Sequence, residues 1–137
     1  MTSNQRKHSI SAELKGQFLR LYQMAMSDED FSPSEWKMLY QFGREREIDK
    51  DALDYILLNS TGSVEVPTEI STKIEYLYDL ARMIWADEQV NEDEISMLKK
   101  YCRRFQFLEE NIQELTNYLL ESAKSNKSKE DLLTELL

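Results

Sequence analysis

Two segments of this chain align without a gap at an offset of 59 residues, and this repeat constrains the fold more than any other feature. Met24–Glu35 reads MAMSDEDFSPSE, and Met83–Glu94 reads MIWADEQVNEDE. Outside these segments the alignment keeps further identities, which are Leu21/Leu80, Met38/Met97, Leu39/Leu98 and Arg44/Arg103. Self-similarity of this kind indicates a duplicated unit that buries its apolar face against its own copy. We therefore predict two related halves.

The residue pattern favours helices throughout. The 137 residues include only three glycines and two prolines, too few for the many tight turns of a β-sandwich or barrel. Apolar residues recur at helical spacing in seven segments, near residues 14–27, 36–43, 50–58, 70–85, 95–105, 112–119 and 128–136. Trp36, Trp85 and Cys102 lie on these apolar stripes, so we expect them in the core.

These segments predict an all-α fold of about seven helices in two pseudo-symmetric halves, which are duplicated helical hairpins packed around one core. We expect a flexible N-terminal tail at residues 1–10 and a single helical domain at 11–137, with repeat halves at about 11–58 and 68–124. The connector at 59–67 is rich in helix breakers. Ser128, with Asp131 three residues on, predicts the start of the C-terminal helix at about 128–136.

The net charge of −9 excludes several classes of partner. A surface of that sign repels nucleic-acid backbones and anionic lipid headgroups, so we expect neither nucleic-acid binding nor membrane insertion. A cation, or a protein with a basic surface, fits better. The single cysteine, Cys102, has no partner in the chain for a disulfide, and no signal peptide or transmembrane run is visible. We expect a cytoplasmic protein.

The repeat is strongest at an acidic corner between two helices. Each copy has an aspartate at the end of the first helix, Asp28 or Asp87, and a glutamate seven residues on, Glu35 or Glu94. The glutamates are predicted to complete capping boxes with N-cap residues that precede them by three positions. The aspartates face the negative end of a helix dipole, which costs about 0.3–1 kcal/mol. Two explanations stay open: an Asx-type turn, or a bound cation that offsets this cost.

The oxygen-only ligands of the corner point to a hard divalent cation, Ca²⁺ or Mg²⁺, if a metal binds. The spacing superficially resembles an EF-hand loop, which needs Gly at position 6 and Glu at position 12. Here position 6 is Pro33 or Glu92, and position 12 is Leu39 or Leu98, so the EF-hand is excluded. The candidate ligands are Asp28, Glu35, Asp87 and Glu94, with Glu29 and Glu88 as weaker candidates.

The same corner resembles the TerB-like domain, a family named for tellurite resistance that carries the pattern Ala-Asp-Gly-x-Ile/Val-x-x-x-Glu between two helices. The second copy matches at Ala86, Asp87, Val90 and Glu94, and the first matches more loosely at Ser27, Asp28, Phe31 and Glu35. The resemblance covers about residues 14–120. It implies about seven helices in two pseudo-symmetric halves, with acidic residues gathered on one side and proposed to bind metal.

The chain departs from this pattern at one position, where the family's glycine is replaced by Glu29 and Glu88. A positive φ is costly for a residue other than glycine. This replacement argues for a different backbone at the corner, and it weakens the metal proposal that the resemblance implies.

The sequence contains no glycine-rich phosphate loop, nucleophile elbow or metalloprotease helix, so we expect a protein that is not an enzyme. Our leading hypothesis is a TerB-like binding or sensing domain whose duplicated acidic corner binds a divalent cation. The stress-response context of that hypothesis is implied by the resemblance alone. The alternative is an acidic protein-interaction scaffold that holds no metal and meets a partner with a basic surface.

Overall fold

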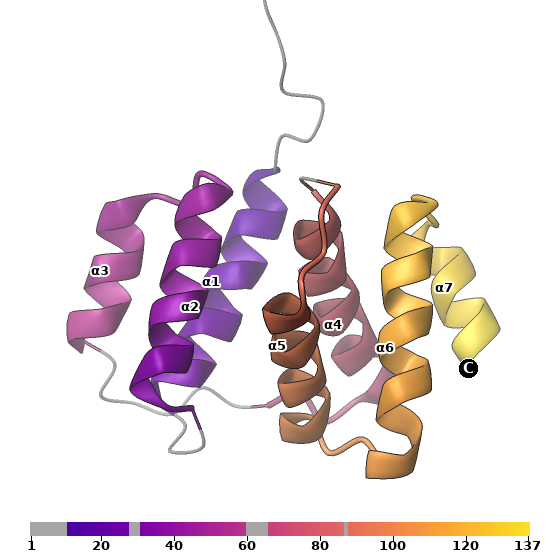
Figure 1. Cartoon of the computed structure of the whole chain (residues 1–137). Coiled ribbons are helices and arrows are strands. Elements are labelled where there is room, and N and C mark those ends of the chain that lie inside the picture. The colour runs from indigo at the N-terminus through magenta and orange to yellow at the C-terminus, as the bar shows by residue number, and fades with distance from the viewer. Residues whose placement is uncertain (1–10, 28–30, 60–65, 87) are drawn as a thin grey trace, which may run out of the picture. The chain divides into compact units, whose positions relative to one another are not determined.

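The structure, a computed structural model, describes residues 11–27, 31–59, 66–86 and 88–137, and these form seven α-helices and no strand (Figure 1). The predicted all-α fold is therefore confirmed. The predicted tail at 1–10 and most of the predicted connector lie outside the described residues. None of the helices in the described ranges is both long enough and apolar enough to span a bilayer.

The chain divides into two compact units, Met1–Glu65 (unit 1) and Val66–Leu137 (unit 2), and the division falls within the predicted connector. The arrangement of the two halves around one shared core stays a prediction. Unit 1 contains α1 (Ala12–Met26), α2 (Pro33–Glu45) and α3 (Lys50–Asn59). Unit 2 contains α4 (Ile70–Trp85), α5 (Glu92–Arg104), α6 (Glu109–Lys124) and α7 (Lys129–Leu136).

In unit 1, α1 packs against both α2 and α3. The ring of Phe18 on α1 lies with its centroid 5.5 Å from that of Phe42 on α2. Gly43 follows Phe42, and a Cβ atom at Gly43 would lie only 2.9 Å from the Phe18 ring. The absence of a side chain at Gly43 therefore lets the α2 backbone approach Phe18 closely.

In unit 2, α4 is the central helix and packs against α5, α6 and α7. Eight of its 16 residues are buried, as expected of a helix that is covered on several sides. Cys102 on α5 is buried, as predicted. Trp36 and Trp85 are only half-buried, so the prediction that they belong to the core is wrong. The ammonium of Lys124 lies 5.7 Å from the ring centroid of Trp85.

Three helices end in the same hydrogen-bonded turn. After α2, the N–H of Glu47 donates to the carbonyl of Arg44, and the N–H of Ile48 donates to that of Gly43. This pair of bonds defines the Schellman motif, and α5 and α6 end with the same two bonds. The left-handed residue of the motif is not glycine in any of them: it is Glu47 (φ 64°), Gln106 (φ 69°) and Asn126 (φ 59°).

Replacing Gln106 by glycine is expected to stabilise the protein. Glycine adopts positive φ without the steric cost that a Cβ atom adds, and so Gln106→Gly raises the free energy of unfolding by about 0.5–1 kcal/mol. Urea denaturation followed by circular dichroism measures the change. The matched control is Glu114→Gly in the middle of α6, where glycine lowers stability by about 1 kcal/mol. A loss of stability in Gln106→Gly would contradict the Schellman geometry.

The thiol of Cys102 is expected to be chemically inert in the folded chain. Burial raises its pKa to about 11, so at pH 8 only about one-thousandth of the thiol is the reactive thiolate. A disulfide reagent at pH 8 should modify the native protein at least 100-fold more slowly than the urea-unfolded protein. The native rate is low because the thiolate fraction is small and because the reagent has poor access to the buried sulfur. Equal rates for the two states would show that Cys102 is not in the core.

Candidate functional site

The repeated acidic corner lies between α1 and α2 in unit 1 and between α4 and α5 in unit 2. Three of its six candidate ligands, Asp28, Glu29 and Asp87, lie outside the described residues. The other three are described: Glu35 and Glu94 in the first turns of α2 and α5, and Glu88 in the second corner. The structure therefore places half of the predicted site.

Glu35 completes a capping box at the start of α2, as predicted. The backbone N–H of Ser32 donates to Oε1 of Glu35 at 2.7 Å, and the Ser32 hydroxyl accepts from the N–H of Glu35 at 3.3 Å. Pro33 occupies the first helical turn, where its missing N–H costs no hydrogen bond. Two backbone donors that the helix cannot satisfy internally are thus satisfied by side chains.

Glu94 does the same for α5. The N–H of Asn91 donates to Oε1 of Glu94 at 3.2 Å, and Oδ1 of Asn91 accepts from the N–H of Glu94 at 2.8 Å. The Glu94 side chain belongs to a residue that is only 6% exposed, whereas Glu35 is half-buried. Both glutamates therefore have a structural role in the helix start, and in each the bonded oxygen is turned back toward the corner.

Glu88 corrects one expectation about the corner. Its φ is 62°, the left-handed conformation that the missing glycine would favour, so the backbone keeps this conformation although the residue is a glutamate. The N–H of Glu88 donates to the carbonyl of Trp85 at 2.8 Å, which closes the turn that ends α4. The next helix begins four residues later. The left-handed conformation of Glu88 costs roughly 1–3 kcal/mol.

The described acids alone do not make a metal site. Within residues 11–27, 31–59, 66–86 and 88–137, no group of three or more histidine, cysteine, aspartate or glutamate side chains is arranged to hold a metal ion. Glu88, Glu92 and Asp93 are exposed in the second corner and the first turn of α5. A cation site at either corner would therefore depend on Asp28, Glu29 or Asp87.

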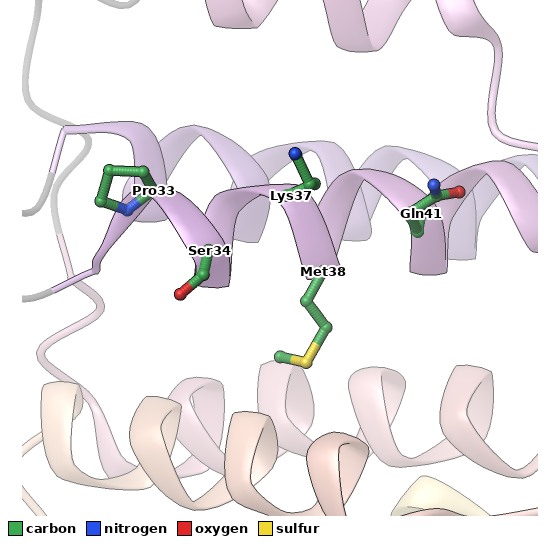
Figure 2. A pocket seen from close by; sticks show the side chains of 5 residues that line it. All are labelled: Pro33, Ser34, Lys37, Met38 and Gln41. Carbon is green, nitrogen blue, oxygen red and sulfur yellow. The ribbon is translucent and has the colours of Figure 1, made fainter.

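One face of α2 next to the first corner borders a pocket (Figure 2). Pro33 and Ser34 lie near the capping box, and the lining continues along the helix through Lys37, Met38 and Gln41. The spacing of three and four residues places these side chains on one side of α2. They supply a hydroxyl, an ammonium, a thioether and an amide, so the chemistry of this face differs from that of the acidic corner.

Asp79, in the middle of α4, is a buried carboxylate that was not among the candidates predicted from the sequence. Asp79 is 1% exposed, and its oxygens lie 3.0 and 3.1 Å from Nζ of Lys129 on α7. Nη1 of Arg82, one helical turn further along α4, lies 3.5 Å from Oδ1 of Asp79. The available signal was an acid within the strongest apolar stripe of the chain, where a charge is expected only if it is paired.

No family model, no curated protein and no solved structure matches the chain. The likeness to the TerB-like pattern remains a resemblance based on the corner residues.

The two N-cap residues are expected to contribute similarly to stability. Ser32→Ala and Asn91→Ala each remove the acceptor for a backbone N–H, and each lowers the free energy of unfolding by about 1 kcal/mol. Urea denaturation measures both. The control is Ser96→Ala on the exposed side of α5, for which we expect a change within about 0.5 kcal/mol. Full stability of both cap variants would show that the boxes do not hold the corners.

Proposed function

We propose that the protein is a non-enzymatic binding module whose repeated acidic corner binds a divalent cation. The observation that carries this proposal is the position of Glu35 and Glu94. The capping boxes fix each carboxylate beside the backbone of the residue that ends the corner, at 2.7 Å from the nitrogen of Ser32 and 3.2 Å from that of Asn91. In the sequence, each glutamate follows Asp28 or Asp87 by seven residues.

A carboxylate that accepts one hydrogen bond still has acceptor capacity. Its two oxygens offer about four lone-pair positions, so a cap bond to Oε1 leaves room for a cation contact. Ca²⁺ and Mg²⁺ take oxygen ligands from carboxylates, backbone carbonyls and water. Asp28 with Glu35, and Asp87 with Glu94, are the main ligands in this proposal, and Glu29 and Glu88 contribute from the same corners.

The TerB-like resemblance supports the same function. Ala86, Asp87, Val90 and Glu94 match the family pattern at the second corner, and the left-handed Glu88 stands where that pattern has glycine. In this proposal the protein is a cytoplasmic TerB-like domain in a stress response. Cation binding then supplies the sensing step.

The second candidate is an acidic scaffold that binds a basic protein without metal. The first turn of α5 carries Glu92 and Asp93, both exposed, next to Glu88 in the corner. Together with the net charge of −9, these acids favour fast, salt-sensitive association with a basic surface. The scaffold therefore needs the negative charge of the corner but no metal-ligand geometry.

Calorimetric titration with Ca²⁺, Mg²⁺ and Mn²⁺ tests the cation. We expect binding by the wild-type chain in or below the millimolar range and at least tenfold weaker binding by Asp28→Asn/Asp87→Asn, since neutral amides are weaker ligands for hard cations. The control variant Asp51→Asn/Glu110→Gln removes the same charge from exposed helix starts and should bind as wild type.

A further variant separates the two roles of the glutamates. Glu35→Gln/Glu94→Gln keeps an oxygen for the cap but loses the negative charge, so it should fold with near wild-type stability and bind the cation more weakly. Absence of heat and of any shift in melting temperature at millimolar cation would exclude the cation. Salt-sensitive binding to a polylysine probe, reduced in the aspartate variant but not in the control, would then favour the scaffold.

A further inference from the structure

The C-terminal helix of unit 2, α7, is anchored to a buried charge. Figure 1 shows α7 at the C-terminal end of unit 2, following α6. Nζ of Lys129, the first residue of α7, lies 3.0 Å from Oδ1 and 3.1 Å from Oδ2 of Asp79 on α4. The Asp79 side chain is 2% exposed and that of Lys129 is 31% exposed. The helix start is therefore tied to one carboxylate on the central helix of the unit.

The connection to α6 and the end of α7 are held by a second set of polar contacts. The hydroxyl of Tyr78 on α4 lies 2.6 Å from the carbonyl oxygen of Lys127, just before α7. The Lys127 ammonium and the Tyr118 hydroxyl both bond to Oε1 of Glu135 near the end of α7. Between these two contacts Leu132 is fully buried. We call the surface of α4 and α6 that carries Asp79 and Tyr118 the α7-docking surface.

These contacts contribute more to the selectivity of the surface for a helix like α7 than to the stability with which α7 is bound. The ion pair with Lys129 gains little net stability, because desolvation of the buried Asp79 carboxylate opposes the attraction between the two charges. Such pairs instead select a partner that places the opposite charge at the right position. Leu132 is the only buried residue of α7, and a helix of eight residues is unstable on its own in water. Departure of α7 would also remove the Lys129 ammonium from the Asp79 carboxylate.

We propose that the α7-docking surface is a recognition site for amphipathic helices, and that α7 is its built-in occupant. The partner is defined by the anchors of α7 itself. It is a helix with a lysine in its first turn and leucines three, four and seven residues later, the pattern of Lys129, Leu132, Leu133 and Leu136. The lysine pairs with Asp79, and the leucines follow one face of the helix.

The covalent link makes α7 a strong competitor of such a partner. The short link from Ser125 to Ser128 gives α7 an effective concentration on the order of millimolar at its own docking surface. A partner helix at micromolar concentration binds only when α7 is displaced. The state of α7 thereby controls access to Asp79.

Anisotropy of a fluorescent peptide with the sequence of Ser125–Leu137 tests this proposal on the full chain. Leu132→Asp places a charge at the buried position of α7 and leaves α4 and α6 unchanged. We expect this variant to bind the peptide at least tenfold more tightly than the wild-type chain does. Adding Asp79→Asn to the Leu132→Asp chain should weaken its binding of the wild-type peptide at least tenfold. The same substitution should weaken binding of a Lys129→Gln peptide less than threefold, since that peptide cannot form the ion pair.

Failure of the Leu132→Asp chain to bind the peptide, with its helix content intact, would overturn the proposal. So would equal binding by the wild-type and Leu132→Asp chains, or dimer formation by exchange of α7 without peptide binding. Hydrogen exchange of the wild-type chain is an independent measurement. We expect the amides of α7 to exchange at least tenfold faster than those of α4, whereas exchange of both only by global unfolding would show that α7 is a fixed part of the core.

Discussion

Backbone hydrogen bonding at the helix ends is the constraint on which the rest of this structure depends. The first N–H groups and last C=O groups of a helix have no partner within it, so they must find partners elsewhere. This chain has three glycines, so its turns use other residues. Glu35 and Glu94 satisfy helix starts, whereas Glu47, Gln106 and Asn126 take left-handed conformations that satisfy helix ends. Some of the acidic residues at the corners, Glu35 and Glu94, are thus explained by their role in capping helices.

The sequence was sufficient for the features that depend on near neighbours along the chain. Helical periodicity predicted all seven helices, and the spacing of Ser32 and Glu35 predicted a capping box that the structure contains. Ser128 accepts a hydrogen bond from the N–H of Asp131, as predicted for the start of α7. Each of these interactions lies within four residues, where helix geometry alone determines which groups meet.

Features that depend on distant residues could not be predicted in the same way. Asp79 and Lys129 are 50 residues apart, and only the packing of α7 on α4 brings them together. Glu88 shows a second limit: its intrinsic preference is against positive φ, yet in the folded chain its φ is 62°. Trp85 lies on an apolar stripe yet stays half-buried, because periodicity identifies a face of the helix but not how far its neighbours extend over it.

The electrostatics of the corner rank its candidate ligands. Helix dipoles place partial negative charge at the ends of α1 and α4 and partial positive charge at the starts of α2 and α5. By chain position Asp28 and Asp87 follow the negative ends, whereas Glu35 and Glu94 lie at the positive starts and already accept cap hydrogen bonds. The negative end of the helix dipole disfavours an aspartate by about 0.3–1 kcal/mol, and the same interaction favours a cation on the aspartate side. The glutamates are favoured as caps with or without a cation. The aspartates are electrostatically favourable only when a cation is bound, so they are the residues whose substitution separates a cation-binding corner from a purely structural one.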